Sequence, residues 1–400
     1  MRRLHALDTL RGVAALAIVI WHWQHFYAIS GEWAENWDRT AQPLYGALKP
    51  LYDAGWVAVD LFFPLSGFIF FWLYGEALRE RRMGGGRFAW LRFSRLYPLH
   101  LVTLLAVAAM QAAFRSATGS FFIYDTNDLQ HFASGLVMAQ QWLPPTIVQS
   151  FNGPAWSVSV EVLLYGVFFC FCRFGLKGAR LALAIAVLSI PLLWWNSFIA
   201  RGLMGFFLGG AVQVLWAKIA MRSDARKIAL RIVAAAATLW GIALSSAYTG
   251  WLYDVCYWLS GHVSPAAGRL FIGESQNLFL LLFIFTVCPL TILALALGEE
   301  VLGFSVRRIS FLGDISYSTY LWHFPMQLAL ALLALRFGWT PASFQHGYVV
   351  MLFYAVLICV GLASFHLFER PMQNWLRGRF ARGRGPVKGD SPATAIGDGL

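Results

Sequence analysis

Long apolar runs separated by short polar segments make up almost the whole chain. A membrane-spanning helix needs about 20 mostly apolar residues, and ten runs meet or approach that length. We interpret each as a spanning helix, and they lie at roughly 10–29, 56–74, 96–114, 157–173, 179–195, 202–217, 228–247, 276–297, 315–335 and 347–368. The ends of the fifth and sixth runs stay open, because only residues 196–201 separate them. The apolar stretch 250–260 is too short to span and predicts an interfacial or re-entrant piece.

Composition supports the same reading. Hydrophobic residues make up 58% of the 400 residues and charged residues only 13%, about half the share in soluble domains. A soluble enzyme needs polar residues to cover its outer faces, so this composition excludes one, and it also excludes a disordered chain. The five cysteines are scattered and form neither a disulfide framework nor a zinc motif. We therefore predict an all-α polytopic integral membrane protein.

The basic residues alternate in step with the apolar runs. With the N-terminus in the cytoplasm, the cytoplasmic segments hold 25 of the 31 Lys and Arg residues. These segments are 1–11, 75–95, 173–180, 218–231, 298–314 and 369–400. Because cytoplasmic loops are enriched in Lys and Arg, the pattern predicts about ten spans with both termini cytoplasmic. The net charge of +11 is then explained by the orientation of the protein in the membrane. We therefore expect membrane lipid, not nucleic acid, as a partner.

The runs form one unit without an internal repeat. We predict a transmembrane domain at 1–371 and a cytoplasmic tail at 372–400. The tail is basic at first and then rich in Gly, Pro and Ser, which is typical of disorder. No fused soluble domain is expected, and the oligomeric state is left open.

Four ionisable residues lie inside apolar runs, where they are expensive and therefore candidates for function: His22, Asp60, Glu161 and His323. A helix rises about 1.5 Å per residue, which places all four between the middle and the outer half of an apolar layer about 30 Å thick. Four helices that bring ionisable groups to one layer predict a shared polar cavity.

Arg11 and His22 are related by helical geometry. Eleven residues are almost three turns, so the two side chains share one helix face, about 16 Å apart along the axis. Arg11 would lie at the cytoplasmic opening of the predicted cavity and His22, a titratable base, deep inside it. This arrangement suits a long anionic ligand that enters from the cytoplasm. Arg92 and Arg95 form an i,i+3 pair at the same mouth, and guanidinium groups suit phosphate oxygens. The alternative is that both are ordinary positive-inside residues that bind anionic lipid.

Each candidate also has a structural reading. His22 and His323 could be packing residues, and Asp60 or Glu161 could serve only to orient His22 or to pair with an arginine. Trp156 could be an interface anchor. The spacing of His22 and His25 fits a metal pair, but two histidines alone are weak evidence, and we expect no metal site.

Six sequence blocks separate the chain from a generic membrane protein. They are LDTLRG at 7–12 followed by His22, GWVAVDLFFPLSGF at 55–68, RFSRLYP at 92–98, WSVSVE at 156–161, SYSTYLWHFP at 316–325 and FERP at 368–371. In this order they resemble the acyltransferase-3 family of bacterial membrane acyltransferases, which O-acylate cell-surface glycans and similar acceptors. The FERP block is expected where the tenth helix ends. Ala58 stands where the family usually has Gly, and Pro64 where it often has Val, so the placing of Ser66 after a kink is left open.

The resemblance implies acyl transfer from acyl-coenzyme A, most commonly acetyl-coenzyme A, to a hydroxyl of a carbohydrate or glycolipid. It implies a multi-pass protein of the bacterial cytoplasmic membrane with acyl-coenzyme A as co-substrate and no tightly bound cofactor. His22 is expected to act as general base, because His is the usual base near neutral pH. Arg11, Arg92 and Arg95 are expected to hold the coenzyme A phosphates. Direct attack and an acyl-histidine step both stay open.

The other site residues follow from the same blocks. Asp60 or Glu161 would orient the imidazole or bind the acceptor, and the oxyanion formed on attack needs a cation or fixed donors, for which Arg11 is a candidate. The residues expected to contact substrate are Ser66, Trp156, Ser159, Tyr320 and His323.

Two other functions compete with acyl transfer. Buried ionisable groups also serve proton relays, so a transporter or flippase of a sugar or organic anion is the main alternative. No paired halves with broken helices support it. A protein-interaction scaffold is disfavoured, since most loops are short.

Overall fold

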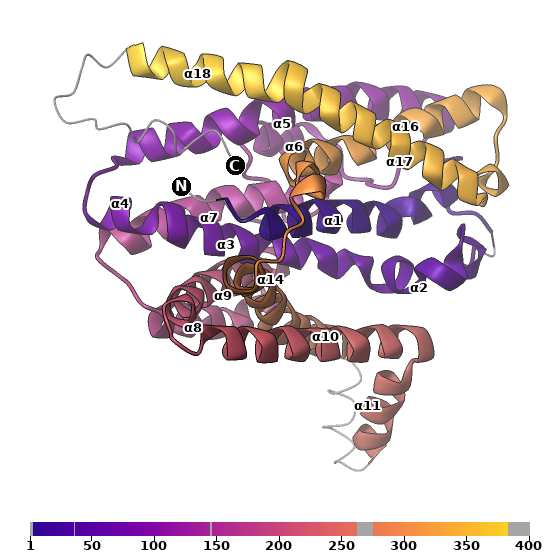
Figure 1. The fold of residues 1–400 in the computed structure, drawn as a ribbon. Helices are drawn as coiled ribbons and strands as arrows, with labels where there is room; N and C mark the ends of the chain where they lie inside the picture. Colours follow the sequence, from indigo (N-terminus) through magenta and orange to yellow (C-terminus); the bar gives the residue numbers. More distant parts are fainter. Residues whose placement is uncertain (1–2, 36, 145, 262–274, 383–400) are drawn as a thin grey trace.

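A computed structural model describes residues 3–35, 37–144, 146–261 and 275–382, and the described residues form helices, turns and loops without a strand (Figure 1). The chain is thus an all-α multi-pass membrane protein, as the hydrophobic pattern predicts. Eight described helical segments are long and apolar enough to cross a membrane. The count of ten and the cytoplasmic placing of both termini stay predictions. The expected disorder beyond Arg384 falls outside the described residues.

The first half of the chain forms the following helices. They are α1 His5–Trp21 with its 3-10 extension η1 His22–Ala28, η2 Arg39–Ala41, α2 Tyr45–Ala54, η3 Gly55–Leu61, α3 Phe62–Leu73, α4 Gly75–Arg79, α5 Gly85–Thr118, α6 Leu129–Leu136, η4 Gly153–Ala155, α7 Trp156–Arg173, α8 Ala179–Leu188 and η5 Ile190–Trp194.

The second half continues in the same way. Its helices are α9 Ser197–Ala220, α10 Ala225–Thr249, α11 Trp251–Gly261, α13 Ser275–Leu282, the π-helix η6 Phe283–Val287, α14 Cys288–Leu302, η7 Arg307–Ile309, α15 Phe311–Asp314, α16 Ser316–Phe337, η8 Pro341–Phe344, α17 Gly347–Ala363, the π-helix η9 Ser364–Glu369 and α18 Arg370–Arg382.

Several predicted boundaries were wrong because helices continue beyond their apolar part. The third span was expected to begin near residue 96, but α5 begins at Gly85, so Arg92 and Arg95 lie within the helix and Pro98 is internal. The last helix was expected to end at the FERP block. It continues through a π-helix and Pro371 to Arg382. Hydropathy marks where a helix is apolar, whereas backbone hydrogen bonding extends into polar sequence.

The fifth and ninth runs differ from simple spans for two reasons. The fifth consists of the ten-residue α8 and a short 3-10 turn that begins at Ile190 and Pro191, because Pro lacks the N–H that would continue the helix. The ninth, α16, is 22 residues long but carries several polar side chains that lower its hydropathy. The stretch 250–260 forms the short helix α11, and its interfacial position stays a prediction.

Glycines allow α3 and α9 to pack with their backbones in contact. A Cβ atom placed on Gly67 would lie 1.8 Å from the Phe206 carbonyl oxygen, and one on Gly209 would lie 2.0 Å from that of Pro64. Small residues at such sites are typical of helix pairs in membranes. Pro64 falls in the first turn of α3, where the 3-10 helix η3 gives way to an α-helix, so it starts α3 without interrupting it.

Helix α1 is held equally closely by the segment before α16. A Cβ atom on Gly12 would lie 2.5 Å from Leu312, and one on Gly313 would lie 2.4 Å from the Asp8 carbonyl oxygen. This contact puts the face of α1 that carries Arg11 against α15 and the start of α16.

Helix α16 contains an internal proline next to His323. Pro325 has no N–H, so the carbonyl of Leu321, four residues earlier, loses its helical partner. The side-chain amide of Asn152 replaces that donor, with Nδ2 3.1 Å from the Leu321 oxygen. The loop before α7 thereby compensates for the break in α16.

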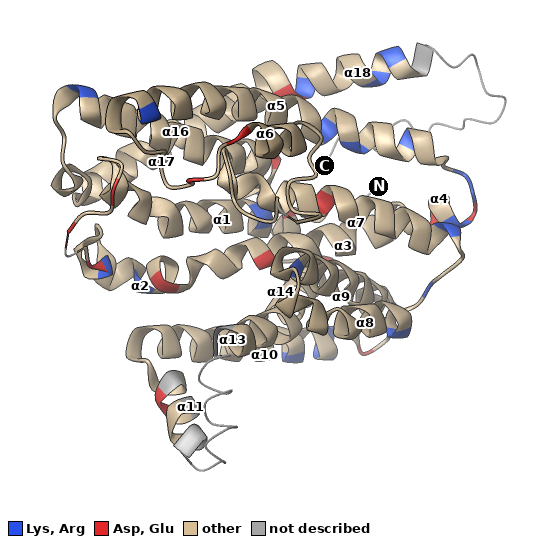
Figure 2. Cartoon of the chain, turned by 180° about the vertical axis from the view of Figure 1, so that it is seen from behind, with Lys and Arg blue, Asp and Glu red and all other residues tan. Residues whose placement is uncertain are grey.

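Charge is unevenly distributed over the molecule. Figure 2 shows Lys and Arg gathered at the end that carries α4, α18 and the beginning of α5. This is the end that the sequence pattern assigns to the cytoplasm.

The glycine contact between α3 and α9 makes a prediction for stability. We expect Gly67→Ala to lower the melting temperature of the purified protein, because the new methyl group overlaps the Phe206 carbonyl and such overpacking costs about 1–3 kcal/mol or more. Gly241→Ala on α10 is the matched control, since a Cβ there meets nothing within 4 Å. Thermal unfolding in detergent measures both, and equal melting temperatures would contradict the packing argument.

Candidate active site

Helices α1, α3, α5, α7 and α16 enclose a cavity of about 110 Å³. Its wall combines aromatic and aliphatic side chains with a small set of polar ones. Six residues expected at the site from sequence line it: Arg11, Ser66, Arg92, Arg95, Glu161 and Tyr320. The cavity therefore joins residues from five separate sequence blocks.

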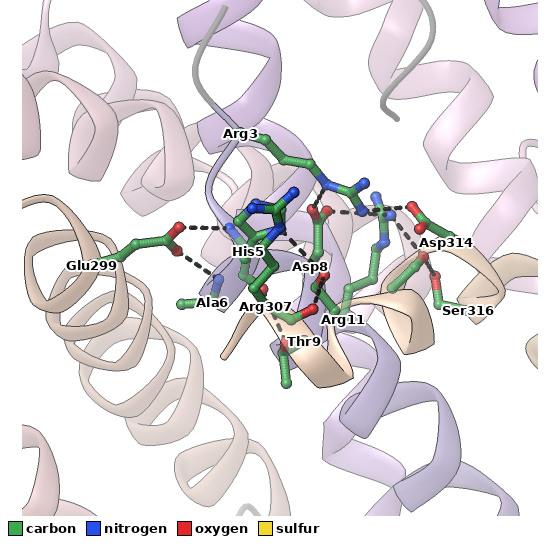
Figure 3. A network of polar contacts seen from close by, with 12 residues as sticks. Arg3, His5, Ala6, Asp8, Thr9, Arg11, Glu299, Arg307, Asp314 and Ser316 are labelled. Atoms are coloured by element: carbon green, nitrogen blue, oxygen red, sulfur yellow. Dashed lines mark hydrogen bonds and ion pairs between the residues drawn. The ribbon is translucent and has the colours of Figure 1, made fainter. Parts of the chain in front are cut away.

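Arg11 enters the cavity from the first turns of α1. Its Nη2 donates to the Gly313 carbonyl at 2.8 Å and lies 3.6 Å from Asp8 Oδ1. Its Nε is buried and has no hydrogen-bond partner among the described residues. Asp8 in turn pairs with Arg3 at 2.5 Å, and Arg3 also reaches Asp314 (Figure 3). Asp8 of the LDTLRG block thus lies between the guanidinium groups of Arg3 and Arg11.

A carboxylate fixes the start of α1 in the same network. Glu299 of α14 accepts from the backbone N–H groups of His5 and Ala6, at 3.1 and 2.7 Å (Figure 3). The first N–H groups of a helix have no partner within it, and a negative charge also suits the positive end of the helix dipole. Arg11 consequently projects from a helix whose end is held on two sides.

The two arginines of α5 differ in how firmly they are held. Arg92 donates to the Tyr74 hydroxyl at 2.8 Å and lies over the rings of Phe70 and Tyr74, with its guanidinium carbon 5.1 and 4.9 Å from their centroids. Arg95 lines the cavity within electrostatic range of Arg11, Arg92 and Glu369. Three guanidinium groups therefore converge on one small space.

Glu161 is the carboxylate of this cavity. One of its oxygens, Oε1, accepts from Ser66 Oγ at 3.0 Å and from the Tyr165 hydroxyl at 2.6 Å. The second oxygen makes no hydrogen bond to the described part of the chain. With three arginines against one glutamate, the cavity is suited to an anionic ligand.

His22 and His323 form a pair just beyond the cavity. Nδ1 of His22 lies 3.1 Å from Nε2 of His323, and the two rings stack with centroids 4.9 Å apart. Both side chains are buried, at 6% and 0% exposure. Neither lines the cavity, but Tyr320 does, and its ring centroid lies 5.8 Å from that of His323. Tyr320 therefore separates the arginines from the histidines.

The shared face predicted for Arg11 and His22 stays a prediction. Arg11 donates to Gly313 in α15, whereas His22, at which α1 gives way to the 3-10 helix η1, contacts His323 in α16. The predicted cavity shared by all four ionisable residues is wrong. Depth along the membrane normal does not fix the direction in which a side chain points, and the four divide among three separate polar groups.

Asp60 belongs to the third of these groups. It is fully buried, and both its oxygens accept from Arg201 of α9, at 2.8 and 2.7 Å. The guanidinium of Arg201 also lies 5.2 Å from the ring of Trp56 and 4.9 Å from that of Trp156. The structural reading of Asp60 as the partner of an arginine is thus the one that the geometry supports. Its carboxylate lies outside the arginine cavity.

Ser159 and Trp156 also lie outside the cavity. Ser159 is fully buried, and its Oγ accepts from the backbone N–H of Gln141 at 3.3 Å. Trp156 packs on Arg201 and Phe63. These two residues position the loop before α7 and the Asp60–Arg201 pair.

Sequence reasoning missed several residues of the site. The charge alternation leaves Arg201 outside the cytoplasmic segments, and the apolar run 157–173 includes Tyr165. Gln327 follows His323 by one helical turn. The i,i+4 spacing of His323 and Gln327 was the available signal. Glu369 was noted only as part of the last block, and it accepts from Ser318 and Ser364.

No cluster of three His, Cys, Asp or Glu side chains that could hold a metal ion occurs within the described ranges. His25, the second histidine of the possible metal pair, instead donates from Nδ1 to Gln327 Oε1 at 3.0 Å. The site as described is built from guanidinium, imidazole, hydroxyl and carboxylate groups.

The buried pair of Asp60 and Arg201 predicts a stability phenotype. Asp60→Asn leaves an uncompensated buried guanidinium, and breaking such a pair costs about 3–5 kcal/mol. We expect a lower melting temperature, with partial recovery in the double variant Asp60→Asn with Arg201→Gln. Thermal unfolding measures both proteins. A stable Asp60→Asn protein with lost activity would instead assign Asp60 to the chemistry.

Comparison with known proteins covers nearly the whole chain. A family model described as an acyltransferase domain, acyltransferase-3, matches residues 4–364. Acyltransferase MdmB of Streptomyces mycarofaciens is 32% identical over 199 residues, which span 48% of this chain and 43% of that protein. The exopolysaccharide production protein ExoZ of Rhizobium meliloti is 27% identical over 354 residues, or 83% of this chain and 93% of ExoZ.

A third relative is protein 2 in the picA locus of Rhizobium radiobacter, 31% identical over 202 residues that span 48% of this chain and 93% of the relative. No solved structure matches the chain. The family match extends from the start of α1 through the whole arginine cavity and the histidine pair. The chain belongs to the acyltransferase-3 family.

Proposed function

We propose that the protein transfers an acyl group, most commonly acetyl, from acyl-coenzyme A to a hydroxyl of a cell-surface carbohydrate or glycolipid. The observation that carries the proposal is the convergence of three guanidinium groups beside a buried histidine pair, in a chain of the acyltransferase-3 family.

The arginine cavity supports an anionic donor. Guanidinium forks match phosphate oxygens, and Arg11 and Arg92 each keep a buried Nε–H without a partner in the described chain. At about 110 Å³ the cavity is smaller than pockets that enclose drug-sized ligands, about 300–1,000 Å³. It would hold the phosphates or the pantetheine arm, with the adenosine outside. Because coenzyme A is cytosolic, the proposal places the arginine end in the cytoplasm.

His22 is the proposed general base. An alcohol is a poor nucleophile until a base takes its proton during attack, and imidazole is suited to this near neutral pH. The acceptor oxygen would bond to the thioester carbon as His22 takes the hydroxyl proton. The carbon–sulfur bond would then break, and the coenzyme A sulfur would leave as a thiol with the proton that His22 took. In this structure the cavity ends at Tyr320, so the thioester would reach His22 only when that side chain moves.

Glu161 and Ser66 are proposed to bind substrate. The free oxygen of Glu161 would accept a hydrogen bond from a pantetheine amide or from an acceptor hydroxyl. Arg11 is proposed to stabilise the developing oxyanion or a phosphate with its unpaired Nε–H.

The acceptor class rests on the relatives. The name of ExoZ refers to exopolysaccharide production, and the alignment with it covers 83% of this chain. A surface polysaccharide or its lipid-linked precursor therefore is the acceptor we propose, in the cytoplasmic membrane of a bacterium. An anion transporter is the second candidate, and the cluster of arginines inside the membrane protein is the observation that favours it.

Reconstitution tests the function directly. We expect protein in lipid vesicles to transfer label from acetyl-coenzyme A to an exopolysaccharide acceptor. His22→Ala should lower the rate by about 10²–10⁴-fold, the usual contribution of a general base. Movement of sugar or organic anion across the vesicles without coenzyme A would favour the transporter. An unchanged rate in His22→Ala would remove the base assignment.

Kinetics of arginine variants test the donor site. Arg95→Ala should raise the KM for acetyl-coenzyme A by about 10–100-fold, because a hydrogen bond between charged groups contributes about 1.5–3 kcal/mol. Arg222→Ala is the control, since Arg222 pairs with Asp224 at the exposed turn between α9 and α10. If both variants shift the KM equally, the effect is one of surface charge and the cavity is not the donor site.

A further inference from the structure

Two residues of α16 hold His22, one by its ring and one by its backbone. His323 Nε2 contacts His22 Nδ1 at 3.1 Å, and Gln327 Nε2 donates to the His22 carbonyl at 3.0 Å. His323 and Gln327 are four residues apart, so they lie on one face of α16. His22 is also where α1 changes to a 3-10 helix.

The Tyr320 carbonyl, His323 and His22 form a series of hydrogen bonds, and the carbonyl fixes which atom donates in each. His323 Nδ1 lies 2.5 Å from the backbone oxygen of Tyr320. A carbonyl oxygen can only accept, so Nδ1 of His323 carries the proton. In a neutral imidazole the other nitrogen then has the free lone pair. Nε2 of His323 is therefore an acceptor.

The same logic passes to His22. Because His323 Nε2 accepts, His22 Nδ1 must be the donor, and Nε2 of His22 is left with the lone pair. That nitrogen makes no hydrogen bond to another side chain in the described ranges. The arrangement leaves one basic atom available on a ring that is fixed on its other side.

Gln327 has an equally defined orientation. Its amide nitrogen faces the His22 carbonyl, so its oxygen faces His25 and accepts from His25 Nδ1 at 3.0 Å. The amide links the two histidines of η1 and holds the backbone at His22. Rotation of the His22 ring is thus restrained by a ring contact, and displacement of its backbone by an amide.

We propose that His323 is a positioning residue that fixes the His22 tautomer with Nε2 as the base. This role rests on the proposed function, in which His22 takes the acceptor proton. His323 touches no substrate in this scheme and acts through His22. The hydrogen bonds from the Tyr320 carbonyl through His323 to His22 would orient the His22 ring. Catalytic and metal-binding histidines in other proteins are oriented in the same way, by a hydrogen bond to their second ring nitrogen.

Paired variants separate positioning from packing. His323→Gln keeps an acceptor oxygen near the position of Nε2, whereas His323→Leu fills similar space without one. We expect His323→Leu to lower kcat by about 10–100-fold, the effect of losing such a supporting hydrogen bond. KM for acetyl-coenzyme A should stay unchanged, and His323→Gln should retain most of the activity. His100→Leu is the control for removal of a buried histidine, since His100 contacts the Gly135 carbonyl of α6 and does not line the cavity.

A spectroscopic measurement reads the tautomer without activity. ¹⁵N NMR of histidine-labelled protein in detergent, with His22 assigned by its substitution, distinguishes protonated from unprotonated ring nitrogens. We expect Nδ1 protonated and Nε2 unprotonated in the native protein, and a mixture of tautomers in His323→Leu. A native protein protonated at Nε2, or equal loss of kcat in the Leu and Gln variants, would overturn the positioning role. Intact activity in His22→Ala would instead defeat the proposed function and leave the tautomer result standing.

Discussion

The cost of an unpaired polar group in apolar surroundings governs this structure. Asp60 is satisfied by Arg201, Glu161 by Ser66 and Tyr165, and the ring of His22 by His323. The backbone obeys the same constraint, since Asn152 supplies the donor that Pro325 removes from Leu321. Apart from the contact of Tyr165 with Glu161 within α7, each pairing joins segments that are distant in sequence. The polar contacts therefore fix which helices are neighbours, while the apolar faces provide the area that holds them together.

The arginine cavity is one place where this constraint is met incompletely. Among the described residues, Arg11 keeps a buried N–H without a partner, and Glu161 keeps one oxygen without a donor. Unused hydrogen-bonding capacity beside bulky aromatic rings is a strong sign of a binding site, because a bound ligand would supply what the protein lacks. The histidine pair differs in this respect. Its members are joined to each other and to α16, which suits a group that must stay in place.

The sequence predicted what depends on local pattern. The apolar runs and the gathering of arginines from two blocks both follow from helical periodicity and charge. It did not predict that Asp60 pairs with Arg201, because 141 residues separate them and only tertiary packing sets which faces meet. The start of α5 and the end of α18 were also not predicted. Both helices continue into polar sequence, where hydropathy does not mark a helix. The sequence predicts how deep a side chain lies in the membrane, but not the direction in which it points around its helix axis.

The glycine contact between α3 and α9 fixes one wall of the cavity. Helix α3 meets α9 backbone to backbone at Gly67 and Gly209, so neither helix can slide or tilt without a collision of main-chain atoms. Near Tyr320 and His323, Pro325 removes a backbone hydrogen bond from α16, but the Asn152 amide replaces it, and Gly313 just before α16 packs against the backbone of α1. A thioester that reaches His22 would therefore have to pass by movement of the Tyr320 side chain, between helix backbones that are held in place.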